Sequence, residues 1–254
     1  MSYDANGHLR QFHEKRVFVN EEMLETPRQR RKANRERLER GLDDAKEPKP
    51  YEFVPQGSYA MRTMVQSETM TADIDDGAVF DRDALKGDRD AHRTPRQAKD
   101  IVCDALSAKN EFKKPPEVRR HCVRVYYNDG FNVDIPVYRT YDENGETKKE
   151  LAAVDEWQRS SPEDVTEWFV KQVDDKSPEG KGSSKQMRRV VRLMKAWARS
   201  RAGWNNPTGF VITVLVDEAY PVKQWLDRDD QALLAVMRSI QNRITMNERV
   251  YRPV

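Results

Sequence analysis

Apolar and β-branched residues gather in three runs of the chain, and these runs predict β-strands. They cover residues 71–80, 119–127 and 131–139. The last two are joined by Asn-Asp-Gly at residues 128–130, which is a typical turn of a β-hairpin. Residues 46–55 contain several prolines and predict an extended connector, because proline disfavours helix at its own position and at the one before.

A helix is predicted within the first part over residues 96–109, and after the loop YDENGE the apolar residues recur mainly at helical spacing. A longer helix is predicted there over 184–201, where Met187 to Trp197 form an apolar stripe. Ser161-Pro162 predicts the start of a further helix, and another begins near Asp229. The outline is a mixed α/β first part followed by a helical second part.

A helix rich in arginine is predicted over residues 27–40, after the Thr26-Pro27 start signal and with Gly41 as its end. Its basic side chains outnumber its acidic ones. Two interpretations remain open for it, a solvated helix face or the flank of an anion-binding cleft.

Composition and charge exclude several classes of protein. A net charge of +2 over 254 residues provides no global basic field of the kind that binders of duplex DNA carry. Cys103 and Cys122 lack metal-ligand spacing and fit a reducing compartment. The longest apolar run, residues 210–216, is too short to span a bilayer, and the polar residues 1–10 contain no signal-peptide core. We therefore expect a cytoplasmic protein without a membrane partner.

The candidate chemistry lies in the stretch DIDDG and in a later strand. Alternate side chains of a strand share a face, so Asp73 and Asp75 point one way while Ile74 and Asp76 point the other. In the run FNVDIPVY, the same alternation sets Asp134 apart from its apolar neighbours. Clustered carboxylates suit Mg²⁺, and three of them can hold two ions. A solvated turn and a calcium loop are alternative interpretations of DIDDG.

Two further features favour binding of a triphosphate. Gly57 would let the backbone approach phosphate groups, and Ser58 would donate its hydroxyl to them. Within residues 184–201, a basic stripe lies beside the apolar one. It consists of Arg188, Arg192, Lys195 and Arg199. Lys195 could be aimed into a cleft by packing of its stem, or could be an ordinary surface lysine.

These motifs, in this order, resemble those of the CD-NTase family, the cGAS/DncV-like nucleotidyltransferases of bacterial anti-phage (CBASS) operons. The resemblance is carried by QGSYAMRT, DIDDG, VDIPVY, SSPEDVTEWF and RLMKAW, and it covers about residues 10–216. It implies an α+β fold in which a polymerase-β-like core, residues 1–150, faces a helical lobe, residues 151–254, across a central cleft. Relatives usually continue beyond the position of Val254, so the helical lobe is expected to be shortened.

The resemblance also implies an activity and a set of site residues. The activity is metal-dependent joining of NTPs, ATP or GTP, into a cyclic di- or trinucleotide messenger that a downstream effector binds, with release of pyrophosphate. Two Mg²⁺ ions, or Mn²⁺, would be held by Asp73, Asp75 and Asp134, with Asp134 also near the attacking hydroxyl. The implied substrate-binding residues are Gln56, Gly57, Ser58, Lys195 and Thr208. The alternatives are a linear oligonucleotide synthase, a transferase of nucleotides to RNA or protein, and an inactive nucleotide-binding module.

Overall fold

The computed structural model divides the chain into two compact units, each built from separated segments. It describes residues 3–66, 73–87, 90–108, 112–128, 130–177, 184–201, 203–221 and 228–254. One unit comprises residues 20–56 and 68–163, and the other comprises residues 1–19, 57–67 and 164–254. The chain therefore passes between the units four times, where the sequence predicted one boundary near residue 150.

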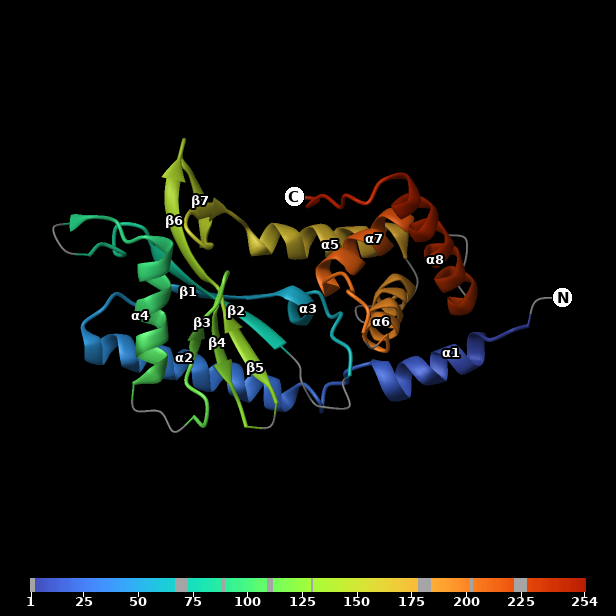
Figure 1. Ribbon diagram of the computed structural model, residues 1–254, viewed down its shortest axis with the longest axis horizontal. Coiled ribbons are helices and arrows are strands. Elements are labelled where there is room, and N and C mark those ends of the chain that lie inside the picture. The colour runs from blue at the N-terminus through green and yellow to red at the C-terminus, as the bar shows by residue number, and fades with distance from the viewer. Residues whose placement is uncertain are drawn as a thin grey trace. The chain divides into compact units, whose positions relative to one another are not determined.

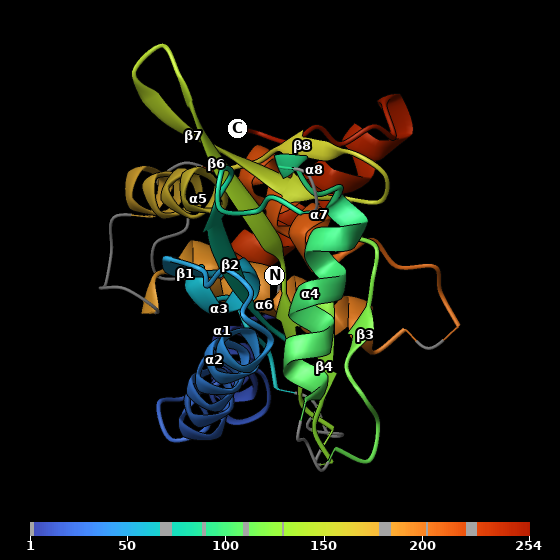
Figure 2. The same cartoon turned by 90° about the vertical axis from the view of Figure 1, so that its left-hand side faces the viewer.

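The first unit is built on a mixed sheet. Its described strands are β1 (Glu52–Gln56), β2 (Asp73–Asp81), β3 (Glu117–Val118), β4 (Val123–Tyr126), β5 (Asn132–Ile135), β6 (Val137–Glu143), β7 (Glu146–Ala152) and β8 (Trp157–Arg159). They are ordered β3-β4-β5-β2-β6-β7-β8, and β1 pairs antiparallel with β2. The central strand β2 runs parallel to β5 at its start and to β6 further on. Figure 2 shows the β6–β7 hairpin extending past the neighbouring strands.

Helices α2 (Glu25–Ala45) and α4 (Pro95–Ser107) cover one face of this sheet (Figure 1). Alternate residues of the strands, among them Ala78 and Phe80 of β2, pack with Leu38 and Leu42 of α2 in a common buried core. This core follows from the period of two in the strands and the apolar stripes of the helices. The opposite face of β2 carries Asp73 and Asp75, as the alternation predicted.

Most predicted elements of this unit are confirmed, with a few differences. The hairpin predicted at residues 128–130 joins β4 to β5, although Asp129 itself lies outside the described residues. The predicted run 131–139 is divided at Pro136, where β5 ends and β6 begins. Residues 52–56 of the predicted connector form β1, because their backbone pairs with β2.

The predicted end of the arginine-rich helix at Gly41 is wrong. Helix α2 continues to Ala45 and is closed by Lys46 in the left-handed conformation. Gly41 serves close packing, since a Cβ atom there would lie 2.1 Å from the carbonyl oxygen of Ala105 in α4. Glycine is therefore required by the contact between two helices and does not terminate the first one.

The second unit is helical. Its described helices are α1 (Asn6–Phe12), η1 (His13–Val17), α3 (Gly57–Ala60), α5 (Pro162–Lys176), α6 (Gln186–Arg199), α7 (Gly209–Ala219) and α8 (Asp229–Met246). Met187, Val190 and Val191 of α6 are fully buried in a core shared with α5, α7 and α8. Within the described parts of the chain, no helix has both the length and the apolar character needed to cross a bilayer.

Candidate active site

Three carboxylates lie on the face of the sheet opposite α2 and α4 because of strand register. Asp75 of β2 is the direct neighbour of Asp134 on β5, and Asp73 is the neighbour of Asn132. The alternation of each strand places all four side chains on the face opposite the helix-covered core. The structure thus brings together the three acids that the sequence singled out.

Arg124 of β4 provides a positive charge to this group. Its Nε and Nη2 atoms donate to the two carboxylate oxygens of Asp134, both at 2.7 Å. Nη2 also donates to Asp73 at 3.3 Å, and Asn132 donates to the other oxygen of Asp73 at 2.9 Å. The forked geometry of guanidinium suits this bidentate contact. Asp134 and Asp73 are therefore held in fixed orientations.

Asp75 is the acid whose protonation the site changes most. Burial and, to a smaller extent, the negative charges of Asp134 and Asp73 together raise its pKa from 3.8 to about 7, while Arg124 acts in the opposite direction. Like charges at short range disfavour ionisation. The repulsion between strand carboxylates that the sequence predicted is thus present in the folded protein.

The donor set suits a hard divalent cation, because it consists of carboxylate oxygens and carries net negative charge when ionised. Among the described residues, however, no three acidic, His or Cys side chains are arranged as a ready metal-binding group. Both carboxylate oxygens of Asp134 accept hydrogen bonds from Arg124. The metal site at Asp73, Asp75 and Asp134 stays a prediction supported by chemistry and charge.

Asp76, the fourth acid of the motif, has a structural role on the opposite face. Its carboxylate is almost fully buried and accepts two hydrogen bonds of 2.6 Å from Arg35 of α2. Arg31 lies 3.9 Å from the same group. Other arginines of α2 stack on aromatic rings, as Arg30 does on Tyr127. Several arginines of α2 thus pack against their own unit, whereas Lys32 and Arg40 are exposed, as on a solvated helix face.

The Gln56-Gly57-Ser58 stretch lies where the chain leaves β1. Gln56 is the register neighbour of Asp75, and its Oε1 atom accepts a hydrogen bond from Tyr138 at 3.0 Å. Gly57 has φ of +65°, a conformation that favours glycine, and it begins α3. The glycine is therefore required by the backbone, whatever binds beside it.

The basic stripe of α6 is directed inward and binds the segment that follows α3. Arg188 donates to the carbonyl of Met61, Arg199 to that of Val65, and Arg192 twice to that of Arg62, whose φ is +56°. These guanidinium groups thus provide hydrogen bonds to backbone carbonyls that lie outside any helix or strand. The stripe is thus a support for residues 61–65 and not the open positive surface that the sequence predicted.

Lys195 belongs to the same support. Its Nζ atom donates to the hydroxyl of Thr63 at 2.8 Å, and its side chain is nearly inaccessible. Burial and, to a smaller extent, the neighbouring charges of Arg199 and Arg192 together lower its pKa to about 7. Lys195 is therefore not an ordinary surface lysine, and its position in a substrate cleft stays a prediction.

Thr208 caps a helix next to Lys195. Its hydroxyl accepts a hydrogen bond from the backbone N–H of Val211 in the first turn of α7, at 3.3 Å. A Cβ atom on Gly209 would lie 3.5 Å from Cε of Lys195. Thr208 therefore has a structural role, and its contact with substrate stays a prediction.

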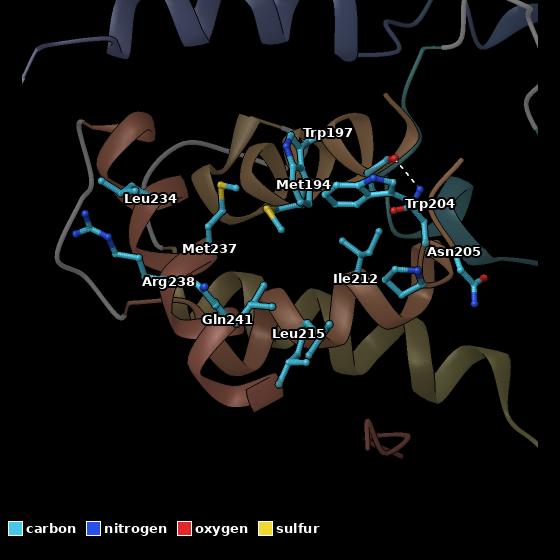
Figure 3. Close-up of a pocket in the computed structure, with 15 residues that line it drawn as sticks. Met194, Trp197, Trp204, Asn205, Ile212, Leu215, Leu234, Met237, Arg238 and Gln241 are labelled. Atoms are coloured by element: carbon cyan, nitrogen blue, oxygen red, sulfur yellow. Dashed lines mark hydrogen bonds between the residues drawn. The ribbon is translucent and has the colours of Figure 1, made fainter. Parts of the chain in front are cut away.

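The helical unit also contains an apolar cavity of about 610 Å³ lined by α6, α7, α8 and residues 204–207 (Figure 3). Trp197 and Trp204 meet edge to face there, with ring centroids 5.9 Å apart. Trp197 is 39% exposed, so it packs less deeply than the predicted apolar stripe implied. Arg238 is the one ionisable residue of the described lining, so this cavity lacks the carboxylates of phosphoryl-transfer chemistry.

Comparison with known proteins places these features in a family. Residues 51–138, which contain β1, β2, β4, β5 and all three acids, match the family model described as the nucleotidyltransferase domain of cyclic GMP-AMP synthase DncV-like proteins. Residues 51–138 are thus similar to a DncV-like nucleotidyltransferase domain. The family prediction made from the motifs is confirmed over this domain.

Solved structures show the same fold around this nucleotidyltransferase domain. A deletion mutant of the Vibrio cholerae dinucleotide cyclase DncV is 16% identical, with a TM-score of 0.75, covering 96% of this chain and 80% of that one. The Bradyrhizobium diazoefficiens CD-NTase CdnG in complex with GTP is 14% identical, with a TM-score of 0.73 and coverage of 97% and 78%. CdnC of E. coli MS115-1 with ATP is 18% identical, with a TM-score of 0.67 and coverage of 97% and 74%. The predicted α+β fold is confirmed.

Sequence reasoning missed Arg124 and Thr63. Arg124 could have been found, since the alternation of HCVRVYY places it opposite Val123 and Val125, and the hairpin turn brings its strand against that of Asp134. Thr63 carries no comparable signal, because it lies in an irregular segment whose partner is 132 residues away.

Proposed function

We propose that this protein is a metal-dependent, template-independent nucleotidyltransferase that joins NTPs into a cyclic di- or trinucleotide. The observation that carries the proposal is the cluster of Asp73, Asp75 and Asp134 on one face of a sheet, within the domain that matches the nucleotidyltransferase model. Relatives solved with ATP, with GTP, or with the linear intermediate pppA(3′,5′)pG support NTPs as the substrates.

The roles of the three acids follow from their chemistry. When bound, two Mg²⁺ ions would stabilise the charge of the triphosphate and of the pyrophosphate leaving group. Asp73, Asp75 and Asp134 would hold these ions, and Asp134 would also lie near the attacking hydroxyl. In the metal-free protein, Arg124 keeps Asp134 and Asp73 oriented through three hydrogen bonds.

The phosphates would be bound by the segment that begins at Gln56. Gly57, in its left-handed conformation, turns the chain so that Ser58 can offer its hydroxyl to the donor phosphate. The inward cations of α6 hold the following residues in place, and Lys195 adds charge beside them. A lysine with a pKa near 7 gains a proton readily when an anion approaches, which favours binding of a triphosphate. Thr208 would contact the nucleotide from the start of α7.

In the cell, we infer a role in anti-phage signalling of the CBASS type, in the cytoplasm, with the messenger read by a downstream effector. This inference rests on the family of the matched domain.

The test is synthesis by purified protein from all four radiolabelled NTPs and Mg²⁺, followed by phosphatase treatment and chromatography. Asp75→Asn is the inactive variant, and Asp104→Asn, at an exposed position of α4, is the control with the same change of charge. We expect a phosphatase-resistant product from the wild type and from Asp104→Asn, and none from Asp75→Asn. Phosphatase-sensitive products would assign linear synthesis instead, and absence of product with both Mg²⁺ and Mn²⁺ would contradict the proposal.

A further inference from the structure

Arg124 lies in the middle of the carboxylate cluster, and its position is set by the hairpin β4–β5. It is the direct neighbour of Asp134 across the two strands. The guanidinium binds both oxygens of Asp134 at 2.7 Å and one oxygen of Asp73 at 3.3 Å, and its side chain is 24% exposed. The guanidinium of Arg124 therefore occupies part of the space that a metal ion would use, and it balances one of the negative charges that such an ion would meet.

The negative charges of the three carboxylates are only partly balanced by Arg124. When all three carboxylates are ionised, they and the guanidinium sum to −2, which one divalent cation would cancel. While Arg124 stays in contact with Asp134, an arriving cation meets a positive charge beside its ligands, and the two repel each other. Asp75 differs from its two neighbours, because the hydrogen bonds of Arg124 within the cluster go to Asp134 and Asp73.

We propose that Arg124 is a displaceable counter-ion that sets how tightly the carboxylates bind a divalent cation. In the metal-free protein it orients Asp134 and Asp73 and relieves their repulsion. When a cation binds, Arg124 gives up hydrogen bonds to these carboxylates, and its guanidinium becomes available to a phosphate. This inference rests on the proposed function, since it concerns the residues that would hold the metal.

The experiment measures binding of Mn²⁺ alone, without nucleotide, from the electron paramagnetic resonance signal of the free ion. Arg124→Gln removes the positive charge, and we expect it to bind Mn²⁺ at least about tenfold more tightly than the wild type. The matched control is Arg119→Gln, which removes one positive charge from an arginine that contacts Tyr126 and Glu117 and not the three acids. The control is expected to bind within about twofold of the wild type, because salt screens its exposed charge.

Two further variants locate the effect. Arg124→Lys keeps the positive charge but loses the bidentate geometry of the guanidinium, and its Mn²⁺ affinity is expected to stay within about threefold of the wild type. Adding Asp75→Asn to Arg124→Gln is expected to abolish the tight binding. Circular dichroism of each variant checks its fold. If Arg124→Gln does not fold, Arg124→Lys still tests the inference, because the exchange rate of its side-chain ammonium protons reports whether the lysine leaves the carboxylates. We expect this exchange rate to rise on addition of Mg²⁺.

Equal or weaker Mn²⁺ binding by Arg124→Gln would overturn the inference and make Arg124 a positioning residue that orders the ligands. Tight binding that survives Asp75→Asn would place the ion elsewhere and also overturn it. Failure of the proposed function can be distinguished from failure of this inference. If the variants bind Mn²⁺ in the expected pattern but the wild type makes no product from NTPs, only the proposed synthesis is refuted.

Discussion

Replacing Asp75 by Asn removes a half-buried negative charge from the carboxylate cluster and keeps nearly the same shape. Because burial raises the pKa of Asp75 from 3.8 to about 7, the folded protein binds more protons than the unfolded chain between these two pH values. The stability of the wild type therefore falls as pH rises through this window, and the loss is complete above pH 7. Asn has no such titration, so Asp75→Asn should stabilise the metal-free protein at high pH.

The size of the effect follows from the same values. A pKa of about 7 against 3.8 corresponds to about 4 kcal/mol of cost in the ionised form, since a tenfold change in proton affinity is worth about 1.36 kcal/mol. Asp75 is only half-buried, so water screens part of this cost, and we expect a gain of about 2 kcal/mol at pH 8. In a chain of this size, that gain raises Tm by about 4 to 8 °C.

The assay is thermal unfolding in EDTA at pH 8 and pH 5. We expect the stabilisation by Asp75→Asn to shrink to less than half at pH 5, where much of the wild-type carboxyl has regained its proton. Asp73→Asn is the control, because that side chain is 47% exposed and the gain should be smaller. A lower Tm for Asp75→Asn at pH 8, or the same gain at both pH values, would refute the reasoning.

Two further predictions concern stability. Arg35→Gln leaves the buried carboxylate of Asp76 without its bidentate partner, and we expect a loss of about 3 to 5 kcal/mol in urea unfolding. A loss below about 1 kcal/mol would mean that another group compensates the charge. Gly41→Ala places a methyl group against the carbonyl of Ala105 and should cost about 1 to 3 kcal/mol, whereas Gly7→Ala, with open space around it, should be neutral or slightly stabilising. Similar effects of the two alanines would contradict the close helix contact.

The sequence by itself determined which acids share a face. The period of two in β2 and β5 separates Asp73, Asp75 and Asp134 from the apolar core, and the turn at residues 128–130 sets the hairpin that carries Asp134. Helix α6 also follows closely from its apolar spacing. These inferences succeed because periodicity is a local property of a strand or a helix.

Only the tertiary structure decided which partner each polar side chain contacts. The arginines of α2 and the cations of α6 have the pattern of exposed, basic helix faces, yet Arg35 binds a buried aspartate and Arg192 binds a backbone carbonyl 130 residues away. Gly41 has the pattern of a helix end, yet a neighbouring helix requires it within α2. Periodicity specifies the direction of a side chain relative to its own element, whereas its partner depends on which distant segment packs there, and that is settled by burial and charge pairing over the whole fold.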